Sequence, residues 1–167
     1  MLATYCYAVI KMLKIFFLFL SFFIASCNAN EPLINPLKPE LESMSFDVVQ
    51  KKLVIEKEIP NQVQSLLSQW FNQKVKIDGF EGDLIFIVSD FTQVISSIAD
   101  GKKVDITMSF EVIINKPSLS QKKLIDGNIS SYGTLTGNFT LNEFDTVIYN
   151  TQSDLILRLT KDLKSKI

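Results

Sequence analysis

Apolar and polar side chains alternate from residue 104 to residue 112, and the apolar phase continues to residue 114. Every second position is apolar: Val104, Ile106, Met108, Phe110, Val112 and Ile114. The positions between them carry Asp105, Thr107, Ser109 and Glu111. Because successive side chains of a strand point to opposite faces, this pattern predicts a long strand with one buried and one wet face. Asp100-Gly101 before it is typical of a hairpin turn, and Pro117 ends it.

Three other segments have the composition of strands. Residues 45–58 contain two apolar groups, separated by Gln50-Lys51-Lys52 as an interruption or a bulge. Residues 84–88 form a continuous β-branched and aromatic run, which is typical of a strand buried on both faces. Residues 124–135 are predicted as a fourth strand, with an in-phase set of Ile125, Ile129 and Leu135.

Two segments carry the three-and-four spacing of an amphipathic helix. The first follows Pro60, which suits a first helical turn because its missing N–H would be unpaired there anyway. Its stripe is Val63, Leu66, Leu67, Trp70 and Phe71. The second begins at Thr140, which forms a capping-box pattern with Glu143. Its stripe is Phe144, Val147, Ile148, Leu155, Leu159 and Leu163.

This order predicts an α+β fold of the form β-α-β-β-β-α over residues 45–167. We expect a single domain with one four-stranded, mostly antiparallel sheet and both helices packed on one face. A chain of this length buries enough surface for one core without disulfides or metals. Trp70 and Phe71 on the first helix are expected in that core, the alternative being an exposed docking patch.

The first 26 residues have the pattern of a signal peptide. Lys11 and Lys14 precede an uncharged apolar run over residues 15–25. That run is about half of the ~20 apolar residues that a membrane-spanning helix needs, so a cleaved signal is favoured over a permanent span. Met12 begins a compact signal unaided and is a candidate for the true start.

The signal ends in Ile24-Ala25-Ser26-Cys27. This tetrapeptide resembles the lipobox of bacterial lipoprotein precursors, which have a branched apolar residue, two small residues and a cysteine. The resemblance implies cleavage between Ser26 and Cys27, a diacylglyceryl group on the Cys27 thiol, and a membrane anchor there. An ordinary secretory peptide is the alternative, because small residues precede its cleavage site too.

Residues 27–44 are predicted as a tether between the lipid and the domain. Three prolines in this segment, Pro32, Pro36 and Pro39, remove backbone donors and favour extended chain. An irregular arm packed over the domain is the alternative, because the segment also carries Leu33, Ile34 and Leu37.

The charge balance argues against a nucleic-acid partner. Seventeen basic residues, less the two in the signal, leave 15 against 18 acidic residues, a net charge of −3 for the mature chain. A nucleic-acid surface requires clustered lysine and arginine, which this sequence lacks.

The residue inventory gives little support to catalysis. The chain has no histidine, the usual general base near neutral pH and the commonest transition-metal ligand. Its only mature cysteine is Cys27, and no serine–lysine motif stands out. We therefore predict no catalytic residues, no metal and no cofactor, with a periplasmic hydrolase as the least favoured class.

The acidic residues do not form a convincing metal or catalytic pattern. Asp78, Glu81 and Asp83 flank two glycines but lack the ligand ladder of an EF-hand. Asp105 and Glu111 are six residues apart on one strand face, about 20 Å at ~3.4 Å per residue. Paired catalytic carboxylates stand within ~10 Å. The polar face of that strand is instead a candidate partner surface, formed by Asp105, Thr107, Ser109 and Glu111.

The mature domain resembles small lipoproteins of the Gram-negative envelope. One uncharacterised group has a tryptophan-bearing helix, a Gly-x-x-Gly turn and a hydrophobic strand, which here correspond to Trp70, Gly79 with Gly82, and residues 84–88. The lipopolysaccharide-assembly lipoprotein family is more distantly similar, with a lipobox and a comparable set of strands and helices. Its members often carry Gly-Tyr or Gly-Trp after the lipidated cysteine, where this chain has Asn28-Ala29.

These observations together predict a membrane-anchored periplasmic lipoprotein that acts as a non-enzymatic binding or adaptor module. The resemblance implies the outer membrane, with the inner membrane as the alternative, because aspartate after the lipidated cysteine retains lipoproteins in the inner membrane and this chain has Asn28. We expect an envelope protein or lipid as partner. The alternative is an accessory subunit of a lipopolysaccharide-assembly or lipid-transport machine.

Overall fold

The computed structural model describes residues 41–167, apart from the side chains of Leu119 and Gln121. The predicted signal peptide, the lipidation site Cys27 and most of the tether lie outside the described residues. The elements in chain order are β1 (Met44–Phe46), β2 (Gln50–Ile55), α2 (Asn61–Lys74), β3 (Val75–Ile77), β4 (Asp83–Ile98), β5 (Gly101–Lys116), the 3-10 turn η1 (Pro117–Leu119), β6 (Gln121–Thr136) and α3 (Leu141–Lys166).

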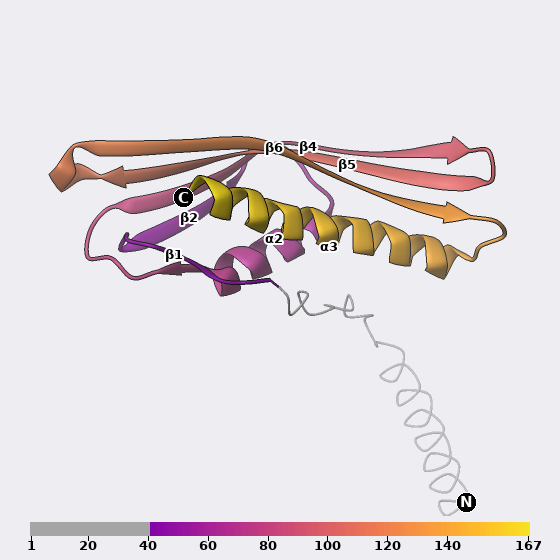
Figure 1. Cartoon of the computed structure of the whole chain (residues 1–167), viewed down its shortest axis with the longest axis horizontal. Coiled ribbons are helices and arrows are strands. Elements are labelled where there is room, and N and C mark those ends of the chain that lie inside the picture. The colour runs from indigo at the N-terminus through magenta and orange to yellow at the C-terminus, as the bar shows by residue number, and fades with distance from the viewer. Residues whose placement is uncertain (1–40) are drawn as a thin grey trace, which may run out of the picture. The chain divides into compact units, whose positions relative to one another are not determined.

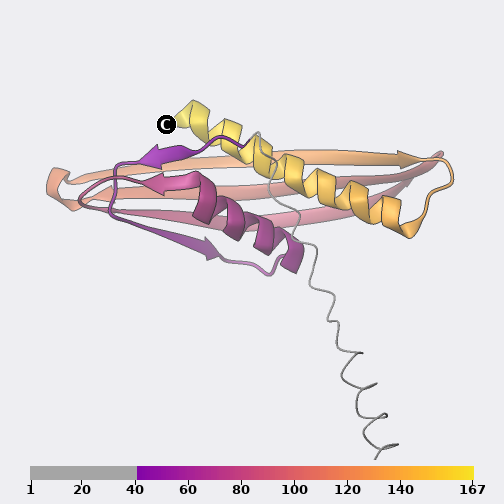
Figure 2. The same ribbon diagram turned by 90° about the horizontal axis from the view of Figure 1, so that it is seen from below.

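The main sheet has four strands in the order β2-β4-β5-β6. Strand β2 runs parallel to β4, and the other two pairings are antiparallel. Both helices lie on the same face of this sheet (Figure 1), and α3 crosses the strands diagonally when the sheet is seen from the helix side (Figure 2). The predicted α+β class, the element order and the mostly antiparallel sheet are confirmed.

Two tight connections join the three long strands. Strands β4, β5 and β6 have 16 residues each. The predicted hairpin at Asp100-Gly101 joins β4 to β5, and a Cβ atom on Gly101 would lie 1.9 Å from the backbone oxygen of Leu135. Only glycine fits that approach.

A bulge between Val88 and Asp90 shifts the register of β4 halfway along its length.

The predicted strand over residues 45–58 is wrong as a single element. Its first part is β1, which pairs in parallel with β3 in a separate two-stranded sheet, and its second part is β2 in the main sheet. The chain turns between them against Gly79, whose added Cβ would lie 2.4 Å from the backbone nitrogen of Val48. Sequence periodicity carries no signal for this long-range backbone contact, and β3 was not predicted for the same reason.

The alternation that predicted β5 is realised in its burial. The inward side chains Val104, Ile106, Met108, Phe110 and Val112 are at most 1% exposed. The expectation of a strand buried on both faces at residues 84–88 is wrong. There the inward side chains are buried, whereas Ile85 and Ile87 are only half-buried on the outer face, because no described element covers that side.

Trp70 is the centre of the core between the helices and the sheet. Its side chain is 0% exposed, and its ring meets that of Phe86 edge-on with centroids 5.2 Å apart. Phe86 stacks on Phe110 at 5.7 Å, and Phe71 lies 6.2 Å from Phe86. Aromatic rings in these arrangements contribute more than their buried area alone. The expectation that Trp70 and Phe71 belong to the core is confirmed.

A buried hydrogen bond ties the two helices together. Trp70 on α2 donates its Nε1–H to Thr160 Oγ1 on α3 at 2.9 Å. The Thr160 hydroxyl in turn donates to the Ile156 backbone oxygen at 2.9 Å. The predicted capping box of α3 is also present, because the Thr140 hydroxyl accepts from the Glu143 N–H and the Glu143 carboxylate accepts from the Thr140 N–H.

Replacing Thr160 with valine tests this helix–helix contact. The change keeps the side-chain shape but leaves the buried indole N–H unpaired, which costs about 1–3 kcal/mol of the free energy of unfolding. Urea titration followed by tryptophan fluorescence measures that loss. Thr146→Val is the matched control, because Thr146 makes the same bond to the carbonyl four residues earlier but is exposed. Equal stability of the two variants would contradict the assignment.

Candidate functional site

The predicted partner surface lies on the face of the sheet opposite the helices. Asp105, Thr107 and Ser109 are half-buried and Glu111 is exposed. All four alternate with the buried residues of β5, so they share one face. Because β5 is flanked by β4 and β6, they form the central row of that face. We call the side of β4, β5 and β6 that faces away from the helices the outer face.

Side-chain interactions fix part of this row. Asp105 Oδ1 accepts from Lys103 Nζ at 2.6 Å on the same strand. The Lys103 ammonium also lies 5.5 Å from the centroid of the Tyr132 ring. Asn128 on β6 donates to Ser109 Oγ at 3.1 Å. These exposed contacts orient the polar side chains without burying them.

Apolar side chains flank the polar row at both ends, which the sequence analysis did not identify. Near η1 these are Ile85, Ile87, Ile113 and Leu124, of which Leu124 is 57% exposed. Near the β4–β5 turn they are Val94, Ile98 and Tyr132. The outer face therefore combines a polar centre with apolar ends, and no described helix covers it (Figure 1).

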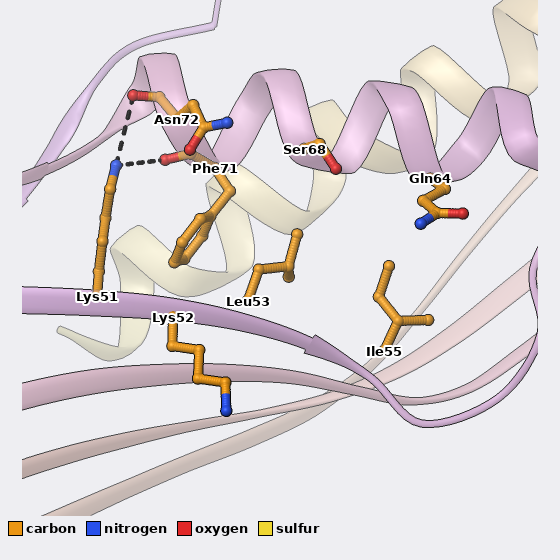
Figure 3. Close-up of a pocket in the computed structure, with 8 residues that line it drawn as sticks. All are labelled: Lys51, Lys52, Leu53, Ile55, Gln64, Ser68, Phe71 and Asn72. Atoms are coloured by element: carbon orange, nitrogen blue, oxygen red, sulfur yellow. Dashed lines mark hydrogen bonds between the residues drawn. The ribbon is translucent and has the colours of Figure 1, made fainter.

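A groove between β2 and α2 was also missed by sequence reasoning. Its volume is about 580 Å³. Figure 3 shows Leu53 and Ile55 of β2 pointing toward α2, whose Phe71 and Ser68 face them. The lining comprises Lys51, Lys52, Leu53, Ile55, Gln64, Ser68, Phe71 and Asn72. It contains two lysines and no carboxylate, so it offers no general acid–base pair.

Lys51 closes one end of this groove. Its ammonium donates to the backbone oxygens of Phe71 at 2.7 Å and Asn72 at 3.4 Å (Figure 3). It also donates to the backbone oxygen of Val75. These carbonyls end helix α2, where backbone oxygens lack partners within the helix. Burial, followed by repulsion from Lys76, lowers the pKa of Lys51. The lysine therefore acts as a helix cap at this end of the groove.

The acidic residues weighed as metal ligands have structural partners instead. Asp78 accepts from the Ser45 hydroxyl at 2.8 Å, and Asp83 accepts from the Asn115 amide at 3.3 Å. Glu81 accepts from the Ser118 hydroxyl. Within residues 41–167 no three His, Cys, Asp or Glu side chains are grouped to hold a metal ion. No helix in that range is long and apolar enough to cross a bilayer.

Comparisons with known proteins find no matching family model and no matching curated protein. Several solved structures have a partly similar arrangement. A minor lipoprotein from Acinetobacter baumannii is 12% identical with a TM-score of 0.48, covering 71% of this chain and 94% of that chain. Rare lipoprotein B from Shewanella oneidensis is 12% identical with a TM-score of 0.40, covering 71% and 98%.

An uncharacterized lipoprotein B from Nitrosomonas europaea is 7% identical with a TM-score of 0.42, covering 75% of this chain and 88% of that chain. All three proteins are lipoproteins by name. At these identities and TM-scores, the likeness assigns neither a family nor a function to this chain.

Replacing Lys51 with methionine tests its role at the end of α2. The variant keeps the apolar stem but loses the charge-assisted hydrogen bonds to the helix carbonyls, and we expect the free energy of unfolding to fall by about 1–2 kcal/mol. Lys52→Met is the matched control, because Lys52 is the next residue of β2 and is exposed. Chemical denaturation of both variants measures the difference. A loss no larger than that of the control would exclude the capping role.

Proposed function

We propose that this protein is a lipid-anchored lipoprotein of the bacterial envelope whose domain is a non-enzymatic binding module. The observation that carries the proposal is the one-sided burial of its sheet. The inner face holds an aromatic and aliphatic core beneath two helices. The outer face carries the row of Asp105, Thr107, Ser109 and Glu111, and nothing within residues 41–167 forms a layer over it.

The dimensions and chemistry of the outer face suit a protein partner. Strands of 16 residues at ~3.3 Å each extend about 50 Å, and three strands span roughly 15 Å, so the face approaches the ~800 Å² that one partner contributes to a standard interface. A polar centre with apolar flanks matches the mixed composition of non-obligate interfaces. A phospholipid would instead require an enclosed apolar pocket for its acyl chains.

The anchor in this proposal is Cys27, which precedes the described residues. Two or three acyl chains hold a protein on a bilayer stably, whereas a single chain binds only marginally. With Asn28 as the next residue, we place the protein on the periplasmic side of the outer membrane. The proline-containing segment would then carry the domain away from the bilayer surface.

Replacing Cys27 with serine tests the anchor. The thiol is the acceptor of the diacylglyceryl group, so the variant is expected in the soluble periplasmic fraction while the unaltered chain sediments with membranes. Density-gradient separation of the inner and outer membranes then reads the location of the unaltered chain. Unchanged membrane fractionation of Cys27→Ser would show that the attachment is not through this cysteine.

Site-specific photo-crosslinking tests the binding surface. A photoreactive amino acid at Thr107, in the centre of the outer face, is expected to give a discrete protein adduct in intact cells. The same amino acid at Asn150, exposed on α3, is the control and should give none. Mass spectrometry of the adduct distinguishes a barrel or transporter, which favours an accessory subunit, from other partners. Lipid-only adducts, or equal adducts at both positions, would contradict a protein partner there.

A further inference from the structure

One edge of the main sheet is formed by β2 along part of its length and by β4 along the rest. Strand β2 pairs with residues 83–88 of β4 and ends at Ile55. Beyond the bulge, residues 90–98 of β4 pair only with β5. No other described strand lies against them, so nine residues present one side of their backbone unpaired. We call residues 90–98 the open edge of β4.

The open edge has a defined beginning. The Glu56 N–H donates to the Val88 carbonyl at 3.0 Å, which is the last backbone contact between the two segments before they separate. Lys57 then pairs with Asp90 at 2.9 Å, with both side chains more than half exposed. From Phe91 onward no described strand pairs with this side of β4. The hydrogen bonds there lie within the chain: the Phe91 N–H donates to Asp90 Oδ1 at 3.1 Å, and the Gln93 and Ser97 side chains accept from Gln152 at 3.1 Å and Lys102 at 2.8 Å.

Beyond the bulge and Asp90, the open edge lacks the charges and prolines that usually keep strand edges apart. Natural proteins protect edges with lysines, prolines or inward charges. Residues 91–98 contain no charged residue and no proline, and Val94, Ile95 and Ile98 are 50%, 47% and 38% exposed. The other edges are different. Strand β2 carries Lys51 and Lys52, and β6 carries charged residues at Lys122, Lys123 and Asp126.

We propose that the open edge of β4 pairs with the same edge of a second copy of this chain. The two β4 strands would run antiparallel about a two-fold axis at Val94, joining two four-stranded sheets into one of eight strands. A two-fold contact uses one surface twice, so that surface must be complementary to itself. Residues 91–98 fulfil this condition, because their backbone donors and acceptors alternate and they carry no charged side chain.

The length of the open edge selects the register. With Val94 opposite its own copy, Thr92 faces Ser96 and Asp90 faces Ile98, so all nine residues of each strand are paired. Shifting the register in one direction drives the end of β4 into the partner's β2, and shifting it in the other leaves residues unpaired. The side chains on the outer face in this register are apolar or neutral at every pair except Asp90, which has no acid opposite.

The same register brings apolar side chains together on the inner face. Phe91 faces Ser97, and Gln93 faces Ile95, so Phe91 and the partner's Ile95 become diagonal neighbours within reach of an aromatic ring. Ile95 is half exposed in the single chain although it is on the inner face, opposite fully buried Val104. Pairing would cover it. This gives the exposed apolar residues at this end of the sheet a partner of matching chemistry.

Pairing would also extend the proposed binding surface. Val94 is in register with Asp105, and Thr92 with Thr107, so the central row of the outer face lies one strand away from the two-fold axis. Two outer faces would form one continuous surface. The inference rests on the proposed function in one respect, since anchoring in a membrane raises the effective concentration that a contact of nine residues requires.

Cysteine crosslinking of the full-length chain in membranes tests both the contact and its register. Residues opposite each other in antiparallel strands have Cα atoms about 4.5–5.5 Å apart, within the span of a disulfide. Val94→Cys is expected to form a covalent homodimer on mild oxidation. The Thr92→Cys chain alone should not form a dimer. When a Thr92→Cys chain and a Ser96→Cys chain are expressed together, the mixed dimer should form. Tyr132→Cys, which is 64% exposed on the opposite edge strand β6, is the control.

The outcomes separate this inference from the proposed function. Absence of the Val94→Cys dimer, or equal dimers from Thr92→Cys alone or Tyr132→Cys, would overturn the pairing. The chain without an added cysteine tests whether Cys27 carries lipid. Disulfide-linked dimers of that chain would show that the Cys27 thiol is free, which would contradict the lipid anchor but not the strand pairing. Repeating Val94→Cys in purified, concentrated Cys27→Ser protein tests the contact independently of the membrane.

Charge substitutions at Val94 give a second readout that does not depend on oxidation. Lysine or glutamate at this position would place like charges opposite each other across the two-fold axis, which destabilises a strand pair. The crosslink between a Thr92→Cys chain and a Ser96→Cys chain should be lost when both chains carry lysine at position 94, or when both carry glutamate. The crosslink should be recovered when one chain carries the lysine and the other the glutamate. Both variants are solvent-exposed changes, so circular dichroism should show an unchanged fold. Undiminished crosslinking in the lysine variant would contradict the register.

Discussion

The packing of Trp70 against the inner face of the sheet is the contact on which the rest of the structure depends. Its ring lies against Phe86 of β4, and its N–H is bonded to Thr160 of α3, so one side chain joins α2, the sheet and α3. Burying an indole requires a partner for its N–H, and Thr160 provides it. Both helices are therefore held on one face, and no other element of the described range covers the opposite face.

This asymmetry sets which surfaces of the described domain are exposed. A sheet with one covered face presents backbone edges and a broad second face to its surroundings, while the core stays independent of any partner. The described residues offer ordered polar contacts such as Asp105–Lys103 and Asn128–Ser109 on that second face, and a lysine-capped groove beside β2.

Local signals in the sequence predicted the elements that depend on local physics. The period of two around Met108 predicted β5, the position of Pro60 predicted the start of α2, and the Thr140–Glu143 pair predicted the cap of α3. The division of residues 45–58 between two sheets depends on a close backbone contact with Gly79, more than twenty residues away. Hydrophobic periodicity could not predict this long-range contact. The polar row of the candidate surface could be predicted from the alternation within β5. Its apolar flanks come from β4 and β6 as well, so they could be identified only once the pairing register of the strands was known.

We propose that the outer face is open in the isolated protein and covered by a partner in the envelope. The most direct measurement is the rate at which a membrane-impermeant maleimide labels Thr107→Cys in purified protein and in outer-membrane-permeabilised cells. Asn150→Cys on α3 serves as the reference. We expect rapid labelling of both positions in purified protein, and protection of position 107 alone in cells. Equal labelling of position 107 in both settings would contradict it.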